Sequence, residues 1–146
     1  MSQPAAGKGY DLILKGGRVL DERNGVDGLV DVAIKAGKIA AVGASLPPGD
    51  STVVDVRGAI VAPGLIDIHT HVYDKATSLS VDPSFIARRS AMTTMVDAGS
   101  AGAGNYDGFR DYVINRSPYR ILAFLNISFP GIFGFDKGVS IGEARL

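Results

Sequence analysis

The feature that most constrains the fold is an alternation of strand-like and helix-like segments that begins after Pro63-Gly64. Apolar segments over residues 65–72, 93–97 and 120–128 have the composition of strands, and helical segments begin near residues 82 and 107. Strands that alternate with helices favour parallel pairing and right-handed crossovers. The sequence therefore predicts an α/β fold, of β-α-β-α-β order, for this part of the chain.

The segment before Pro63 has a different pattern, with short β segments and turn signals only. Ala36-Gly37 separates two alternating segments and predicts a hairpin. The expected strands cover residues 10–15 with a resumption at 18–20, then 29–35, 38–43, and a strand pair at 52–56 and 59–62 broken at Arg57-Gly58. We expect a flexible N-terminus over residues 1–9, a small β-sandwich subdomain over 10–62, and βα units over 63–146.

Helix signals support the βα order. Asp82 followed by Pro83 is a typical N-cap and first turn, and the helix is expected to reach about Ser90. In the second helix, from about Asp107, apolar residues recur at i, i+3 and i+4: Phe109, Tyr112 and Val113.

The strand over residues 65–72 carries the chemistry. Strict alternation would place Asp67, His69 and His71 on one face, because residues two apart on a strand point the same way. A parallel sheet normally buries both faces, and buried polar groups are costly unless something satisfies them. Two imidazoles at i and i+2 can converge on one divalent metal. Asp67 lies deeper and is expected to support the ligands or the strand.

These are the only two histidines in the chain, and they fall at a strand end in a βα series, where barrel enzymes place their active sites. The alternative is that the chain is a complete small βα domain of another kind, with both histidines as core residues.

Composition limits the partners. Fifteen basic and fifteen acidic side chains cancel, which argues against nucleic acid or a membrane surface as a partner. The chain has no cysteine, so a metal here would need nitrogen and oxygen ligands. No signal peptide or membrane-spanning segment is visible, and we expect a cytoplasmic protein.

The segment 62–71, Ala-Pro-Gly-Leu-Ile-Asp-Ile-His-Thr-His, resembles the first barrel strand of the amidohydrolase superfamily. Segments 10–19 and 31–43 are similar to the small β-sandwich that precedes the barrel in that family. The segment 92–102 resembles the second-strand region of a deacetylase-like branch, near D-aminoacylases and dihydroorotases. The resemblance covers residues 10 to 135.

The resemblance implies a (β/α)8 TIM-type barrel and a metal-dependent hydrolase that uses metal-activated water. The bond cleaved would be a C–N amide, a cyclic amide or a related ester, as in an N-acyl amino acid deacetylase. His69 and His71 would bind the more buried of one or two divalent ions, with Zn²⁺ expected first. The family's bridging lysine, later histidines and late aspartate have no counterpart here, and Lys137 does not match the lysine position.

A complete barrel needs eight strands and about 250 residues, whereas about three strands are visible here. We therefore expect an incomplete barrel, an N-terminal fragment that ends in a helix start at residues 141–146, with no catalytic residue of its own. The reading frame after Leu146 is expected to encode the missing ligands. The alternative is a non-catalytic fragment that binds metal weakly or only self-associates through unpaired strand edges.

Substrate contacts are expected from polar residues at the later strand ends, namely Asp97, Ser100 and Asn126. For Asp97 and Asn126 the alternative is a turn residue. Dihydroorotases commonly have an arginine two residues after the second histidine, and Tyr73 at that position favours the deacetylase-like branch. The substrate is expected to be a small molecule, and the protein a homo-oligomer.

Two loops complete the predictions. The run Gly99–Gly104 lacks the Lys-Ser/Thr of a phosphate loop and is expected to be a flexible βα loop. The segment Phe129–Phe135 is expected either to cover a pocket or to pack against a neighbour.

Overall fold

The computed structural model describes residues 9–132 and shows a mixed α/β protein. The chain divides into two compact units, Met1–Pro63 and Gly64–Leu146. The predictions for residues 1–8, for Lys137, for the helix start at 141–146 and for the end of the Phe129–Phe135 loop lie outside the described residues. Within the described part, no helix has the length and apolar character needed to cross a membrane.

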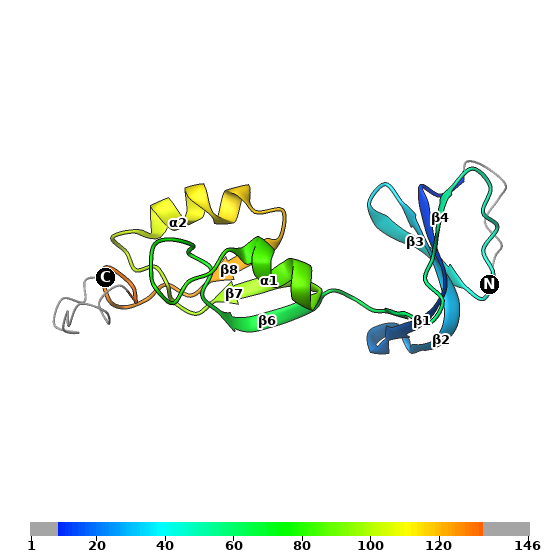
Figure 1. Cartoon of the computed structure of the whole chain (residues 1–146), viewed down its shortest axis with the longest axis horizontal. Helices are drawn as coiled ribbons and strands as arrows, with labels where there is room; N and C mark the ends of the chain where they lie inside the picture. Colours follow the sequence, from blue (N-terminus) through cyan, green and yellow to red (C-terminus); the bar gives the residue numbers. More distant parts are fainter. Residues whose placement is uncertain (1–8, 133–146) are drawn as a thin grey trace. The chain divides into compact units, whose positions relative to one another are not determined.

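The first unit is built on one five-stranded sheet (Figure 1). Its elements are β1 (Leu12–Asp21), the short 3-10 helix η1 (Glu22–Asn24), β2 (Val26–Lys35), β3 (Lys38–Gly43), β4 (Thr52–Asp55) and β5 (Ile60–Val61). The strand order is β3-β2-β1-β4, and β5 also pairs with β1. The sandwich expected from the sequence stays a prediction, since residues 9–63 show this one sheet.

The predicted hairpin is confirmed, since β2 and β3 pair antiparallel. Ala36 and Gly37 form its turn with φ of 50° and 71°, the left-handed backbone that a two-residue hairpin needs. The predicted pairing of segments 52–56 and 59–62 with each other is wrong. β4 and β5 each run parallel to β1, because the link between them keeps the chain direction instead of reversing it.

Strand β1 does not stop at Gly16-Gly17 but continues through an irregularity between Leu14 and Gly17. Gly16 has φ of 77°, which few other residues adopt. Its N–H donates to Asp31 Oδ1 at 2.9 Å, and Leu46 N–H donates to Asp31 Oδ2 at 2.9 Å. The buried carboxylate therefore joins β1, β2 and the loop after β3.

The second unit has the predicted β-α-β-α-β order, with all three strands parallel. The Asp82 carboxylate caps the first helix by accepting the Ser84 N–H at 2.7 Å, as predicted from the sequence. The elements are β6 (Leu65–Thr70), α1 (Pro83–Ser90), β7 (Met92–Asp97), α2 (Tyr106–Tyr112), η2 (Ile114–Arg116) and β8 (Arg120–Ala123). β8 is shorter than the predicted strand.

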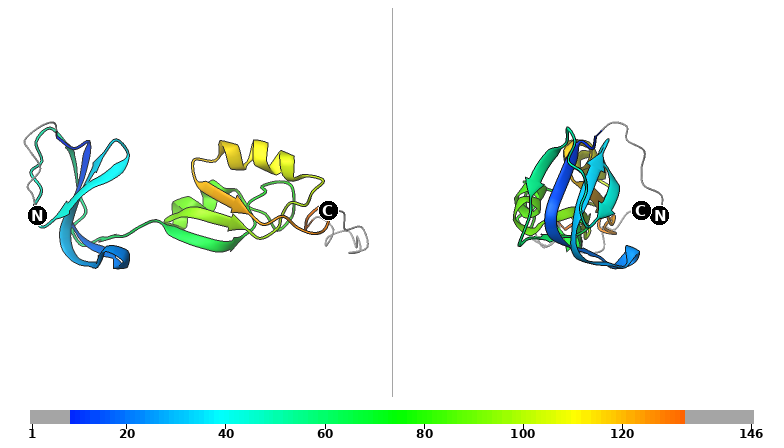
Figure 2. Two further views of the ribbon diagram at one scale, coloured as in Figure 1. Left: turned by 180° about the vertical axis from the view of Figure 1, so that it is seen from behind. Right: turned by 90° about the vertical axis from the view of Figure 1, so that its right-hand side faces the viewer.

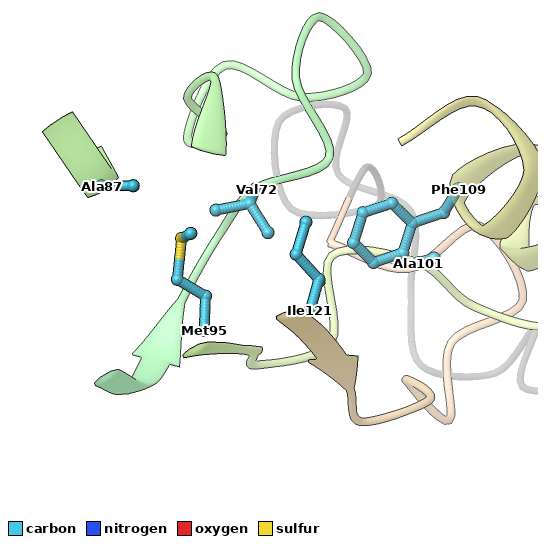
Figure 3. Packing of buried hydrophobic residues seen from close by; sticks show 6 residues of the cluster. All are labelled: Val72, Ala87, Met95, Ala101, Phe109 and Ile121. Carbon is cyan, nitrogen blue, oxygen red and sulfur yellow. The ribbon is translucent and has the colours of Figure 1, made fainter. Parts of the chain in front are cut away.

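The core of this unit lies between the sheet and both helices. Met95 on β7 and Ile121 on β8 point towards the helix layer, where Ala87 of α1 and Phe109 of α2 meet them (Figure 3). The left view of Figure 2 shows α2, in yellow, along one face of this sheet. Of the periodic apolar residues of α2, Phe109 is fully buried, whereas Tyr112 is 69% exposed and its ring lies against the guanidinium of Arg116.

The first part of the glycine run after β7 is packed, while Ala103 and Gly104 are exposed, and the flexibility expected of this loop stays a prediction. Gly99 to Gly102 are buried, and Gly102 N–H donates to Asn105 Oδ1 at 2.9 Å. A Cβ on Gly102 would lie 1.8 Å from the carbonyl oxygen of Ser128, so only glycine allows this close approach.

We expect Asp31→Ala to lower the free energy of unfolding by about 1–3 kcal/mol at neutral pH, because it leaves two backbone N–H groups without their acceptor. Chiefly through the Leu46 N–H, the fold holds the pKa of this carboxyl below its ordinary value of 3.8. A lowered folded-state pKa stabilises the fold above the ordinary value, and the stabilisation is lost as pH falls through the folded pKa.

Denaturant titrations of both chains between neutral and acidic pH measure this difference, which should shrink at low pH. Asp27→Ala is the control, since its carboxylate forms an exposed pair with Arg18. Equal stability of Asp31→Ala and the parent chain at neutral pH would contradict the prediction.

Candidate metal centre

The two histidines lie at the carboxyl end of β6, with His69 inside the strand and His71 one residue past its end. Their rings lie close together, with centroids 5.7 Å apart and planes at 76°. The structure therefore brings the two predicted imidazoles to one place. The local backbone that does so differs from the expected one.

Strict alternation along β6 is interrupted. Asp67 pairs with Met95 and Thr70 with Asp97, so β6 advances by three residues between these two pairs while β7 advances by two. The prediction that Asp67, His69 and His71 share a face by simple alternation is therefore wrong. Such an extra residue bends a strand and re-aims its side chains, often beside functional sites. The Asp67 carboxylate accepts the His69 N–H at 2.9 Å and supports the irregularity.

Strand β6 is also less buried than predicted. Ile66 is 64% exposed and Ile68 is 74% exposed, and the His69 side chain is exposed. Helices cover one face of this three-stranded sheet, on the side of Met95 and Ile121. The other face of the described unit has no covering layer, which is why the expected burial of both faces is not observed.

The backbone around His71 is held at three points. Ala98 N–H donates to Thr70 O at 2.8 Å, Val81 N–H donates to His71 O at 3.0 Å, and Val72 N–H donates to Asp97 Oδ2 at 2.8 Å. Val72 itself is fully buried in the core. His71 therefore leaves the sheet from a rigid support.

Asp97 and Ser100, both predicted substrate contacts, are fully buried beside His71. Asp97 lies on the helix side of β7, two residues after Met95, and its second carboxylate oxygen accepts the Ser100 N–H at 2.6 Å. The Ser100 hydroxyl lies 3.0 Å from His71 Nδ1. Both contacts support the histidine, while substrate contact by either residue stays a prediction.

Asn126 does not join the histidines in any contact found among the described residues. Its amide nitrogen donates to Gly99 O at 2.9 Å, and its amide oxygen accepts Ser128 N–H at 2.9 Å. It therefore holds the two loops after β7 and β8 together, which matches the turn-residue alternative. A direct contact with substrate stays a prediction.

Sequence reasoning missed the hydroxyls of Ser80 and Thr77, which extend this polar cluster. Ser80 Oγ lies 3.5 Å from Ser100 Oγ and 2.8 Å from Thr77 Oγ1. No pattern marks them in the sequence, because the loop after β6 has no fixed period. Only the fold brings these hydroxyls to Ser100.

The histidine pair fits part of a zinc site. Two imidazoles bound to one ion through one nitrogen each, about 2.0–2.1 Å away, would have ring centroids roughly 5–6 Å apart. The contact of Nδ1 with Ser100 leaves coordination by His71 to Nε2. Residues 9–132 contain no group of three or more histidine, cysteine or carboxylate side chains placed to bind a metal. Among these residues the two imidazoles are the candidate donors, and metal binding by them stays a prediction.

The second unit is a parallel α/β unit with two histidines at a strand end. Comparison with known proteins shows which family has this arrangement. The chain is 46% identical to a deacetylase of Agrobacterium fabrum over 102 residues, 69% of this chain and 25% of the relative. A deacetylase of Brucella anthropi is 44% identical over 76% of this chain and 28% of its own length. A dihydroorotase of Streptococcus thermophilus is 42% identical over 41% of this chain and 14% of its own length.

Comparison with solved structures points to the same family. A dihydroorotase superposes with a TM-score of 0.75 at 37% identity, covering 82% of this chain and 32% of that one. An adenine deaminase superposes with a TM-score of 0.72 at 31% identity, covering 93% and 36%. No protein-family model matches the chain. The chain belongs to the amidohydrolase superfamily, and it spans about a quarter to a third of the length of these deacetylases and solved structures.

We expect Asp97→Asn to destabilise the second unit by about 1–3 kcal/mol, because an amide nitrogen would face one of the two backbone donors that the carboxylate now accepts. Hydrogen exchange of the Val72 and Ser100 amides should accelerate more than that of the β8 amides. Asp107→Asn, at an exposed position on α2, is the control. Unchanged exchange at both amides would show that the carboxylate does not hold them.

Proposed function

We propose that this chain provides the first two metal ligands of a metal-dependent hydrolase that cleaves C–N amide bonds, with N-acyl amino acids as the substrate class. Cyclic amides and related esters are the neighbouring classes. The observation that carries the proposal is the His69–His71 pair, with rings 5.7 Å apart at the end of a parallel strand. The deacetylases and the dihydroorotase that resemble the chain support it.

A divalent ion, with Zn²⁺ as the first candidate and one or two ions per site, would supply an activated water and polarise the scissile carbonyl. The residues of this chain would hold the ion and fix its place. His71 is the better anchored ligand, through Ser100 and the bonds on either side of its backbone. Asp67 would hold the strand irregularity at His69 in place.

We further propose that β6, β7 and β8 are three strands of a (β/α)8 barrel and that residues 10–62 form a β-sandwich subdomain before it. Their parallel order and the superposition with a dihydroorotase support the first part. The uncovered apolar side chains of the sheet, including Ile68 and Leu122, support self-association of the chain in isolation. A cytoplasmic location and a small-molecule substrate stay predictions.

Tyr73 supports the deacetylase branch over dihydroorotase. Its ring stacks on Phe109 with centroids 4.7 Å apart, and its hydroxyl donates to Asn105 O at 3.3 Å. This position therefore packs the loop after β6 against α2 and offers no cation for a substrate carboxylate. The sequence matches to the two deacetylases cover 69% and 76% of the chain, against 41% for the dihydroorotase of Streptococcus thermophilus, while a solved dihydroorotase superposes over 82%.

The second candidate function is non-catalytic: a chain that binds metal weakly or only associates with copies of itself. The described residues offer two histidine donors and no group of three possible ligands, which favours this non-catalytic candidate for the chain in isolation. Turnover by the isolated chain would exclude this second candidate. We expect the zinc-loaded chain alone to hydrolyse N-acetyl amino acids no faster than the double variant His69→Ala/His71→Ala, and faster hydrolysis would exclude the non-catalytic alternative.

Calorimetric titration with Zn²⁺ tests the ligand pair directly. We expect the full chain to bind zinc and the double variant His69→Ala/His71→Ala to bind it at least about tenfold more weakly, because the imidazoles are the nitrogen donors of the site. Glu22→Gln removes an acidic group of the other unit and should bind like the parent chain. Equal binding by the double variant would remove the proposed metal site.

A further inference from the structure

Ser100 is placed to act on His71. Its side chain is fully buried, and its Oγ lies 3.0 Å from His71 Nδ1. Its own backbone is held on both sides, since its N–H donates to Asp97 Oδ1 at 2.6 Å and its carbonyl accepts the Ile132 N–H at 3.3 Å. The backbone that carries the hydroxyl is therefore held next to the imidazole.

One carboxylate fixes the distance between the two residues. Asp97 accepts N–H groups from Ser100 and from Val72, the neighbour of His71. The loop after β7 is further enclosed by Gly131, where a Cβ would lie 2.2 Å from the Ser100 carbonyl oxygen. The contact between Ser100 and His71 is thus imposed by the buried backbone around it.

The contact also limits how the imidazole can be protonated. In a neutral imidazole one nitrogen carries the proton and the other offers a lone pair. A hydroxyl oxygen has two lone pairs, so Ser100 Oγ can accept the Nδ1–H of His71 as well as the hydroxyl of Ser80, which donates to it at 3.5 Å. Thr77 Oγ1, 2.8 Å from Ser80 Oγ, continues the chain of hydroxyls.

We propose that Ser100 is a positioning residue that accepts the Nδ1–H of His71 and keeps the lone pair of Nε2 directed to the metal. This inference rests on the proposed metal role of His71. Hydrogen bonds from the second nitrogen of a ligand histidine fix its tautomer and ring orientation, and their loss weakens metal binding. Ser100 then acts through the ligand and not on the substrate.

The tautomer of His71 tests the proposal without metal. Two-bond ¹H–¹⁵N correlation spectra of the full metal-free chain report which ring nitrogen carries the proton. The chain has two histidines, so His69→Gln assigns the signals of His71. We expect the Nδ1–H tautomer. A dominant Nε2–H tautomer would overturn the proposal, whatever the variants do.

Ser100→Ala removes the hydroxyl and leaves the rest of the side chain in place. We expect it to shift His71 to a mixture of tautomers and to weaken Zn²⁺ binding about 10–100-fold. Ser80→Ala, one hydroxyl further away, should change zinc affinity much less. Ser100→Thr keeps the hydroxyl and should retain the Nδ1–H tautomer if it folds. An unchanged tautomer and zinc affinity in Ser100→Ala would overturn the proposal.

The two hypotheses fail in different ways. If the parent chain has the Nδ1–H tautomer but does not bind zinc, the proposed metal function fails and the contact stands. If the parent chain binds zinc through the histidines and Ser100→Ala binds it equally well, the metal function stands and the positioning role fails.

Discussion

The buried carboxylate of Asp97 is the interaction on which the candidate site depends. It accepts two backbone N–H groups, from Val72 after β6 and from Ser100 after β7. A buried carboxylate without such donors would be costly, and the donors would be equally costly without it. The two loops that carry His71 and Ser100 are therefore fixed to one another before any metal or substrate binds. Through this one side chain, the two loops of the candidate site are attached to the end of β7.

Hydrogen bonds behind a side chain can set its orientation before a metal binds. Metal ligands function best when their orientation is set in advance by contacts behind them. His71 has such support from backbone and hydroxyl, whereas His69 lies exposed on an irregular strand with Asp67 as its local contact. The two histidines are thus unequally supported, since the backbone and ring of His71 have more contacts than those of His69.

Much of this could be predicted from the sequence, because local signals decide it. Asp82-Pro83 marks a helix start, and the strand and helix alternation gives the parallel order. The two histidines, two residues apart at a strand end, indicate a metal site from residue type and spacing alone. The irregularity between Asp67 and Thr70 was not predictable, since strand register depends on the neighbouring strand rather than on the residues themselves.

The role of Asp97 was not predictable for a related reason. An acid at a strand end reads equally well as a substrate contact or as a turn acid, and only the structure shows that this one is buried and accepts two backbone N–H groups. The same holds for Ser100, whose partner is twenty-nine residues earlier in the chain. Sequence spacing can identify candidate metal ligands that are two residues apart, as in His69 and His71. The groups that orient those ligands come from other strands, and tertiary structure is needed to find them.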